Sequence, residues 1–387
     1  MDVVVVGAGI TASRVVEELQ AKGHAGRITV IGAERHQPYD RPPLSKEVLR
    51  GEGREPTLPT DWSGVQLLLS RQVVALSTSD KQIRLDDGTT SPYDALVIAT
   101  GARPRTLPVL SGAGVHVLRS RDDAAALADD IRRAGRLVVI GAGFIGSEVA
   151  ASARAMGAAV TMIEILPAPL SRVLGEQVGQ AIATMHGEQG VDLHCGVSVQ
   201  ESRGEGDDRE LVLSDGQVVA APVVLVGLGV TPDTGWLDGS GVEVDDGVVC
   251  DATGRTSVGQ VWAAGDVARW WHPLYDAAIR MEHWTSAAAQ GSVVAQSVLG
   301  EDRPLDEVPY FWSDQYGLKL QMLGRPAPGD DVTLLQVGPK ERLVAVYGRS
   351  GVATAVFGVG AARWVMRSGP LLQERSSVDE AIALMGT

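Results

Sequence analysis

Two short glycine-rich segments are the residues whose type and spacing predict chemistry most directly. Gly7-Ala-Gly9-Ile-Thr-Ala12 follows a run of four valines, and Gly141-Ala-Gly143-Phe-Ile-Gly146 follows Leu137-Val-Val-Ile140. In such a segment the first glycine permits a tight turn, the second lets the backbone approach a pyrophosphate, and the third position, glycine or alanine, packs a helix on a strand. Amides at the start of that helix then bind the phosphates. Each segment is therefore expected to bind a dinucleotide.

A carboxylate follows each turn at the distance expected for the acid that binds a ribose. Glu34 comes after the predicted strand 28–31, and Glu164 comes after the predicted strand 160–163. A carboxylate at this place accepts hydrogen bonds from the 2′-hydroxyl of NADH and repels the 2′-phosphate of NADPH. Glu164 therefore favours NADH as the nicotinamide cofactor.

The elements that must position these turns repeat as well. The second turn begins at Gly141, 134 positions after Gly7, and the glycines that end the following helices, Gly23 and Gly157, are separated by the same offset. Each copy predicts strand, turn, helix and strand, which is the unit of a Rossmann-like α/β fold. One copy is weak evidence because such spacings occur by chance, but two copies in this context are strong. Two dinucleotides in one chain are most simply a tightly held FAD and a nicotinamide donor.

The segments between and after these units predict domain boundaries. Pro104 to Pro108 follow a predicted strand at 94–99, and Thr231-Pro232-Asp233 follow a similar strand at 222–229. Proline stops these strands from continuing as helices, so we expect the chain to cross between domains there. From Pro309 the pattern changes to alternating strands followed by helices, which predicts a third domain beginning near residue 307.

Composition and charge exclude several classes of function. The chain has 387 residues and a net charge of −14, so a phosphate backbone would be repelled and nucleic acid is not expected as a partner. Cys195 and Cys250 form no CxxC motif, which predicts neither a disulfide framework nor a zinc site and suits a reducing cytoplasm. Met1 precedes a valine run without a basic segment, and the longest apolar run, about 218–230, is too short to cross a bilayer. Neither export nor membrane attachment is expected.

Five further motifs resemble those of a known family. They are Pro38-Tyr-Asp-Arg-Pro-Pro-Leu-Ser-Lys46, Ala99-Thr-Gly-Ala-Arg-Pro104, Ala263-Ala-Gly-Asp266, Glu282-His-Trp284 and Tyr310-Phe-Trp-Ser-Asp-Gln315. Together with the two turns they resemble the FAD-dependent NAD(P)H ferredoxin (rubredoxin) reductases, a branch of the glutathione-reductase-like flavoproteins. The resemblance covers nearly the whole chain, and its first and last stretches are the most specific to this branch.

The resemblance implies an architecture and an activity. The architecture has two Rossmann-like domains, one for FAD (1–107 and 233–306) and one for NAD (108–232), and a C-terminal α+β interface domain (307–387). The implied activity is that of an NADH:ferredoxin oxidoreductase. It passes a hydride from NADH to FAD, and then single electrons to a 2Fe-type ferredoxin or a rubredoxin that serves an oxygenase. A cytoplasmic monomer or homodimer is expected.

The resemblance also assigns site residues by their positions in the motifs. Gly7, Gly9 and Thr11 would face the FAD pyrophosphate, Glu34 the ribose, Asp266 the ribitol and the backbone of Trp284 the isoalloxazine. The other residues assigned to the FAD site are Ala12, Arg41, Val73, Ala99, Thr100, Gly101, Arg119 and Trp312. Gly141, Gly143, Gly146 and Glu164 would bind the nicotinamide dinucleotide, with Ile145 and Gly227 along the nicotinamide channel and Arg172 near the adenosine. The family often carries its ribose-binding acid one position earlier, at the place of Ala33.

Lys46 and Glu148 are the residues that the resemblance assigns to the chemical step. In the family, the matching residues lie beside the flavin N5, where the hydride arrives. A lysine there favours electron density on the reduced ring, and a carboxylate partner makes its burial tolerable. For Glu148 the alternative role is an ordinary acid in the first turn of a helix, where it interacts favourably with the helix dipole. For Lys46 the alternative is a solvated charge in a loop. Instead of binding the cofactor, Asp266 could cap the N-terminus of a helix, and Trp312 could pack in the hydrophobic core.

Two other functions stay open on this scaffold. One is a reductase of a small molecule such as monodehydroascorbate or a quinone, and the other is an NADH-gated interaction protein similar to apoptosis-inducing factor. A disulfide reductase is excluded because the region beside the flavin reads Leu44-Ser45-Lys46, without a vicinal cysteine pair. His272 and His283 lack matching ligands, so no metal site is expected.

The charge distribution indicates where an acidic ferredoxin would dock. Residues 309–387 contain eight Lys or Arg and seven Asp or Glu, which leaves this segment at +1 while the rest of the chain carries −15. The C-terminal domain is therefore the least repulsive surface. Lys319, Arg325, Lys340 and Arg342 are the candidate docking residues.

Overall fold

The computed structural model describes residues 1–53 and 55–386. The chain forms two compact units, and each unit is built from three separate stretches of the sequence. The first unit contains residues 1–40, 56–103 and 231–307, and the second contains residues 41–55, 104–230 and 308–387. Two short paired strands, β8 (Ala102–Pro104) and β17 (Val230–Pro232), lie where the chain passes between the units.

The first unit is built on a five-stranded parallel sheet in the order β19-β7-β1-β2-β3. Its strands are β1 (Val3–Val6), β2 (Ile28–Gly32), β3 (Val65–Leu69), β7 (Ala95–Ile98) and β19 (Val261–Ala263). Two three-stranded sheets accompany it, β4 (Val73–Ser77) with β5 (Gln82–Leu85) and β6 (Thr90–Pro92), and β18 (Val248–Cys250) with β20 (Ala268–His272) and β21 (Ala277–Ile279).

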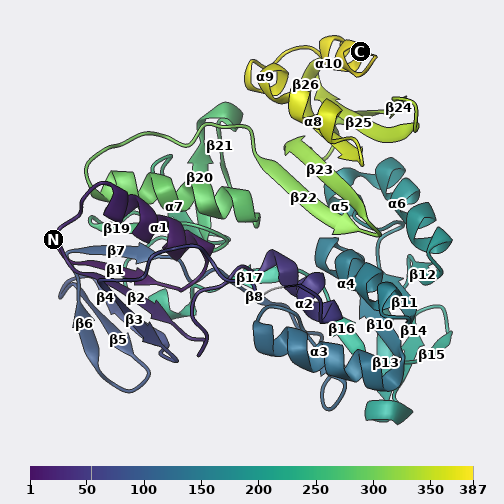
Figure 1. The fold of residues 1–387 in the computed structure, drawn as a ribbon, viewed down its shortest axis with the longest axis horizontal. Helices are drawn as coiled ribbons and strands as arrows, with labels where there is room; N and C mark the ends of the chain where they lie inside the picture. The colour runs from purple at the N-terminus through teal and green to yellow at the C-terminus, as the bar shows by residue number, and fades with distance from the viewer. Residues whose placement is uncertain (54, 387) are drawn as a thin grey trace. The chain divides into compact units, whose positions relative to one another are not determined.

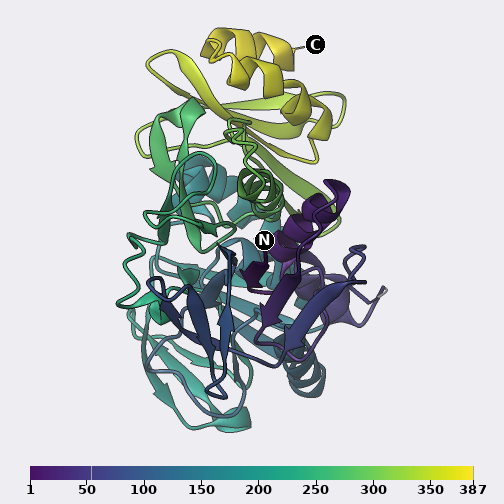
Figure 2. The same cartoon turned by 90° about the vertical axis from the view of Figure 1, so that its left-hand side faces the viewer.

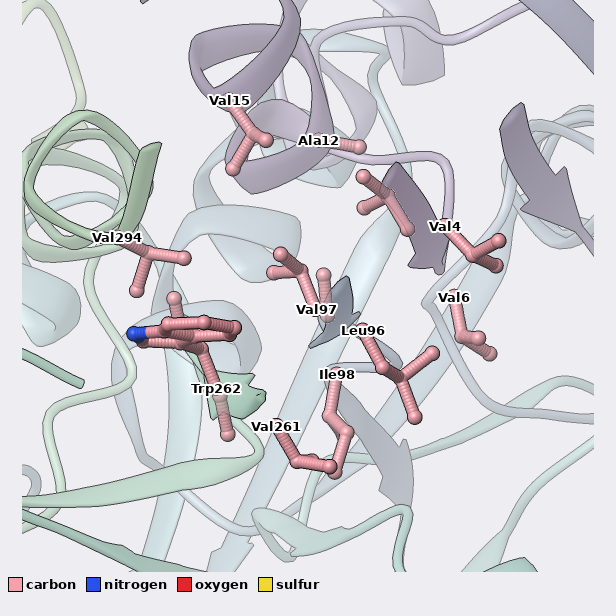
Figure 3. Close-up of a cluster of buried hydrophobic side chains, with 14 of the residues drawn as sticks. Val4, Val6, Ala12, Val15, Leu96, Val97, Ile98, Val261, Trp262 and Val294 are labelled. Atoms are coloured by element: carbon pink, nitrogen blue, oxygen red, sulfur yellow. The ribbon is translucent and has the colours of Figure 1, made fainter. Parts of the chain in front are cut away.

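Two helices, α1 (Ile10–Ala21) and α7 (Trp284–Val298), pack side by side next to this sheet (Figure 1). A Cβ on Gly291 of α7 would come within 2.7 Å of the Thr11 carbonyl oxygen, so glycine is what allows the two backbones to approach. Figure 3 shows the core that the helices and strands share. Its labelled side chains are Val4, Val6, Leu96, Val97, Ile98, Val261 and Trp262 from strands and Ala12, Val15 and Val294 from the helices, all buried.

The second unit contains a matching parallel sheet in the order β12-β11-β10-β16-β9. Its strands are β9 (Val115–His116), β10 (Arg136–Ile140), β11 (Ala159–Glu164), β12 (Val191–Cys195) and β16 (Val224–Val226). An antiparallel sheet is formed by β13 (Val199–Arg203), β14 (Glu210–Leu213) and β15 (Val218–Ala220). The helices are α2 (Glu47–Arg50), α3 (Arg121–Ala134), α4 (Phe144–Ala155), α5 (Ser171–Leu174) and α6 (Glu176–Glu188).

The repeat predicted from the sequence is present at the level of single hydrogen bonds. Helix α4 begins and ends 134 positions after α1. The amide of Gly7 donates to the Ile31 carbonyl at 2.8 Å. The amide of Gly141 donates to the Ile163 carbonyl, also at 2.8 Å. Both parallel sheets therefore present a glycine turn at the carboxyl end of the central strand, where dinucleotides bind in folds of this type.

The chain ends in an antiparallel sheet in the order β22-β23-β26-β25-β24, within the second unit. The strands are β22 (Tyr310–Gln315), β23 (Leu318–Gly324), β24 (Asp331–Val337), β25 (Arg342–Arg349) and β26 (Val352–Val359), followed by α8 (Ala362–Arg367), α9 (Gly369–Gln373) and α10 (Val378–Met385). Figure 2 shows these helices on one face of the sheet. Val365, Leu372 and Met385 share a buried cluster with Val356 of the sheet. Over the described ranges, no helix has the length and apolar character needed to span a membrane.

Candidate functional site

The first glycine turn has the geometry of a phosphate cradle. Gly7 has a φ of +114°, and a Cβ there would overlap the carbonyl oxygen of Ala99 at the end of β7. Gly9 is the N-cap of α1, and a Cβ on it would meet open space. No described side chain caps this helix, and its first turn, 10–13, is uncharged. Its amides and the positive end of its dipole therefore fit a pyrophosphate.

Short hydrogen bonds order Glu34, the carboxylate predicted to bind the ribose, and the residues around it. Glu34 is half-buried, and its Oε2 accepts a hydrogen bond from the Tyr39 hydroxyl at 2.5 Å. Ala33 is exposed; it occupies the position at which the family described above often carries its ribose-binding acid. Next to Tyr39, Asp40 Oδ1 accepts a hydrogen bond from Nε1 of Trp284 at 2.6 Å. Asp40 thereby orients the residue whose backbone was predicted to reach the isoalloxazine.

Asp266 lies in a turn rather than at a helix start. It follows β19 and precedes β20, while α7 begins only at Trp284, so the N-cap alternative is wrong. The preceding residue, Gly265, donates its amide to Oε1 of the buried Gln290 at 2.7 Å, which holds the turn. Burial lowers the pKa of nearby His283 to about 4, and the negative charge of Asp266 acts in the opposite direction.

The other residues predicted for FAD lie in different settings. Thr100 donates its hydroxyl to the Asp233 carbonyl at 2.8 Å and so fixes the segment that contains Gly101. Val73 is buried in the hydrophobic core of the first unit. In the second unit, Arg41 donates to the carbonyl of Arg119 at 2.5 Å, across 78 positions of sequence.

The second glycine turn leaves less room at its third position than the first turn does. A Cβ on Gly141, whose φ is +95°, would lie 2.5 Å from the carbonyl oxygen of Gly227. A Cβ on Gly143, the N-cap of α4, would again meet open space. A Cβ on Gly146 would overlap the Gly141 carbonyl oxygen, so this copy requires glycine where the first tolerates Ala12. Ile145 in the first turn of α4 is 47% exposed, which leaves an apolar side chain available for a ligand.

The carboxylate of Glu164 folds back towards the second turn. It is buried, its Oε2 accepts from the Ala142 amide at 2.7 Å, and its Oε1 accepts from the Leu166 amide at 2.9 Å. Each oxygen retains a second lone pair for a ribose hydroxyl. Cys195 lies opposite Glu164 in the sheet, and burial together with that negative charge raises the pKa of its thiol to about 11.

Arg172 lies on the exposed side of α5. It lines a cavity of about 280 Å³ together with the loop 326–330 and Tyr347. Tyr347 donates its hydroxyl to the carbonyl of Leu174 at 2.8 Å, which fixes α5 to the C-terminal sheet.

Lys46 and Glu148 form a buried ion pair although they are 102 positions apart. The ammonium Nζ of Lys46 lies 2.6 Å from Oε2 of Glu148, and both side chains are at most 10% exposed. Glu148 lies in the second turn of α4, which has no acid in its first turn, and so the dipole alternative is wrong. The burial of Lys46 likewise rules out a solvated loop charge. Such a pair is stable only when further hydrogen bonds satisfy both groups.

Three other groups complete this network. Lys46 also donates to the carbonyl of Pro42 at 3.0 Å, in the 3₁₀ turn Pro42–Ser45. Ser45 donates its hydroxyl to Glu148 Oε2 at 2.5 Å, and Ser313 of β22 donates to Oε1 at 2.7 Å. Neither serine was singled out from the sequence. Both lie inside motifs that were, directly before Lys46 and directly after Trp312.

Trp312 is half-buried and stacks on Tyr310 at a centroid distance of 6.1 Å. The opposite face of β22 meets α4, where the rings of Phe311 and Phe144 lie 4.2 Å apart. In residues 1–53 and 55–386, no cluster of three or more His, Cys, Asp or Glu side chains has an arrangement that could hold a metal ion.

The sequence and the fold of this chain are similar to those of known proteins. Residues 1–291 match the family described as pyridine nucleotide-disulphide oxidoreductase, and residues 310–384 match the domain described as reductase C-terminal. The anthranilate 1,2-dioxygenase system ferredoxin–NAD(+) reductase component of Burkholderia cepacia is 38% identical, with 98% of each chain covered. The chlorobenzene dioxygenase ferredoxin reductase component of a Cupriavidus species is 37% identical over 98% of this chain and 94% of the relative. The solved structure of a covalent putidaredoxin reductase–putidaredoxin complex is similar with a TM-score of 0.92 and 31% identity, covering 99% of this chain and 98% of the other.

Proposed function

Since the chain belongs to the pyridine nucleotide-disulphide oxidoreductase family, we propose that it transfers electrons from NADH to a ferredoxin. It is an oxidoreductase whose cofactors are FAD and NADH. The observation that carries the proposal is the pair of glycine turns related by 134 positions, each with an open N-cap glycine at the end of a parallel strand. Bound FAD supplies the redox step, because it accepts a hydride and releases electrons one at a time.

The residues of the chain supply placement and charge. We assign the amides at Gly9 and Gly143 to the two pyrophosphates, and Glu34 and Glu164 to the two adenosine riboses. Glu164 selects NADH because a carboxylate held by two backbone amides cannot move aside for a 2′-phosphate. Lys46, held by Glu148, places a positive charge at the reacting groups, where it stabilises the negative charge that develops during hydride transfer.

The partner proposed is a ferredoxin of the 2Fe type, with rubredoxin as the alternative iron–sulfur protein. The names of the relatives, which are components of dioxygenase systems, support an oxygenase as the final acceptor. The similar solved complex, in which putidaredoxin reductase is joined covalently to putidaredoxin, supports direct docking of the partner. We further propose that the protein acts in the cytoplasm as a monomer or homodimer.

The domain roles are part of the same proposal. Residues 1–107 and 233–306 would bind FAD, 108–232 would bind NADH, and 307–387 would form the interface domain. The boundaries between the two compact units after residues 103, 230 and 307 lie close to these limits and support them, whereas residues 41–55 and 308–387 group with 104–230 in the second unit.

The test is purification followed by rapid-mixing kinetics. We expect about one FAD per chain, fast reduction by NADH, slow reduction by NADPH, and turnover that depends on an added ferredoxin. Ferricyanide, which needs no protein docking, is the control acceptor. Rapid reduction of a quinone or of monodehydroascorbate without ferredoxin would instead assign a small-molecule reductase. A reduced protein that reoxidises slowly and changes its oligomeric state would assign the interaction function.

A further inference from the structure

The Glu148 carboxylate is held from two sides by different parts of the chain. Its Oε2 accepts hydrogen bonds from Lys46 and Ser45, which lie in the segment before α2. Its Oε1 accepts a hydrogen bond from the hydroxyl of Ser313, which lies in the C-terminal sheet 165 positions later in the sequence. Ser313 is fully buried, and its oxygen accepts in turn from Nε2 of the buried Gln315 at 3.2 Å. Gln315, Ser313 and Glu148 thus form a directed chain of donors that ends on the carboxylate.

The strand geometry makes this arrangement specific. Side chains alternate between the two faces of a strand, so Phe311, Ser313 and Gln315 lie on one face of β22. Phe311 packs on Phe144 at the start of α4, and this contact places Ser313 over the next turn of the helix, at Glu148. The position of β22 against α4 therefore determines which carboxylate oxygen accepts the hydrogen bond from Ser313.

A buried carboxylate depends on such donors. Glu148 is 4% exposed, so an oxygen that loses its donor does not regain full hydration from bulk water. The carboxylate would then rotate or draw in a water molecule, and the ammonium of Lys46, fixed through Oε2, would shift with it.

We propose that Ser313 is a positioning residue for electron transfer from NADH, through which the C-terminal domain fixes the Glu148 carboxylate and thereby the ammonium of Lys46. This inference rests on the proposed function. It adds that the C-terminal domain takes part in the reductive half-reaction, in which no ferredoxin is bound, as well as in partner docking.

The experiment measures flavin reduction by NADH in rapid mixing, with the holoenzyme and without ferredoxin. Ser313→Ala should lower the rate constant at saturating NADH about five- to tenfold, with the apparent Kd for NADH changed less than about twofold. Ser313→Thr keeps the hydroxyl and should restore most of the rate. Ser147→Ala is the matched control, because Ser147 is also a fully buried serine of this region and its hydroxyl bonds to no described residue.

A double-mutant cycle separates positioning from a general structural effect. If Ser313 acts through Lys46, then adding Ser313→Ala to a Lys46→Met variant should change the rate constant by less than about twofold. Loss of the same factor in both backgrounds would overturn the proposal, as would a wild-type rate in Ser313→Ala or an equal loss in Ser147→Ala. A wild-type protein that NADH does not reduce would contradict the proposed function instead, so the two failures are distinguishable.

Discussion

The hydroxyl of Tyr316, in the turn between β22 and β23, lies 2.7 Å from Nδ1 of His186 in α6. The two rings meet edge to face at a centroid distance of 5.4 Å. His186 is fully buried, and this burial lowers its pKa to about 4. The contact fixes the tip of the C-terminal hairpin to the helix of the preceding domain through a histidine that stays neutral at physiological pH.

The stability of the protein should consequently fall in mild acid. A histidine in the unfolded chain titrates near pH 6.5, so between pH 6.5 and about 4 the unfolded state binds more protons than the folded state. The stabilisation from neutral His186 is complete above pH 6.5 and is lost progressively as the pH falls towards 4, by up to about 3 kcal/mol. Thermal unfolding at pH 8 and at pH 5 checks this.

His186→Asn should lower the melting temperature at pH 8 but reduce the further drop at pH 5. His283, whose pKa is also lowered to about 4, keeps part of the acid sensitivity in the variant. An identical drop in variant and wild type would show that His186 does not titrate in this range.

Glu164 is expected to determine the choice of nucleotide. Glu164→Ala removes a charge-assisted hydrogen bond of about 1.5 to 3 kcal/mol and should weaken NADH binding roughly ten- to hundredfold. It should weaken NADPH binding less, because the repulsion of the 2′-phosphate is lost at the same time. Titration of flavin reduction rates with both nucleotides is the measurement, and Glu188→Ala, an exposed glutamate of α6, is the control. Equal catalytic efficiency of the wild type with the two nucleotides would contradict the assignment.

Lys46 is expected to act on the rate and little on affinity. Lys46→Met should slow flavin reduction at saturating NADH by about tenfold or more, while the Kd for NADH, set mainly at the adenosine end, should change little. Removal of the cation also leaves Glu148 buried beside an apolar chain, so the variant should be less stable. Lys340→Met, at an exposed lysine, is the control. An unchanged reduction rate in Lys46→Met would remove Lys46 from the mechanism.

The basic residues of the C-terminal sheet should steer an acidic ferredoxin. Lys319, Arg325 and Lys340 are exposed, whereas Arg342 is half-buried beside Gly360. Arg325→Glu combined with Lys340→Glu should therefore lower the ferredoxin-dependent rate several-fold at low salt and weaken its dependence on ionic strength. Ferricyanide reduction should stay unchanged.

The matched control for this charge reversal is the pair Lys81→Glu and Arg84→Glu, which are exposed in the first unit and change the net charge equally. If both double variants lower the ferredoxin-dependent rate by the same factor, the effect comes from net charge and not from docking at the C-terminal sheet.

The sequence predicted those parts of the molecule that depend on neighbouring residues. Gly7 and Gly141 adopt the positive φ that a tight glycine turn after a strand predicts, and the strand Val3–Val6 and its helix obey simple periodicity. The predicted α/β class, the family and the two cofactors are confirmed by the matches over residues 1–291 and 310–384.

Local patterns could not predict the groups that hold the site in place. Gln290 supports the turn at Gly265 across 25 positions, and Ser313 reaches Glu148 across 165. A serine or glutamine on a strand or helix has no distinctive spacing, and its partner depends on how distant elements pack. The roles assigned to individual cofactor-binding residues stay predictions for the same reason, because they depend on bound molecules.

The alternation along β22 restricts how this part of the chain can vary in length. Insertion or deletion of one residue between Tyr310 and Ser313 would exchange the faces of the strand, turning an indole ring towards α4 and the serine hydroxyl away from Glu148. The loop at 325–330, which joins β23 to β24, has no strand alternation to preserve, although Asp330 binds Ala327, Arg349 and Thr354 at its end. Changes of length in this domain should therefore be tolerated better at that loop than in β22, where a shift of one position would disconnect Glu148 from the C-terminal sheet.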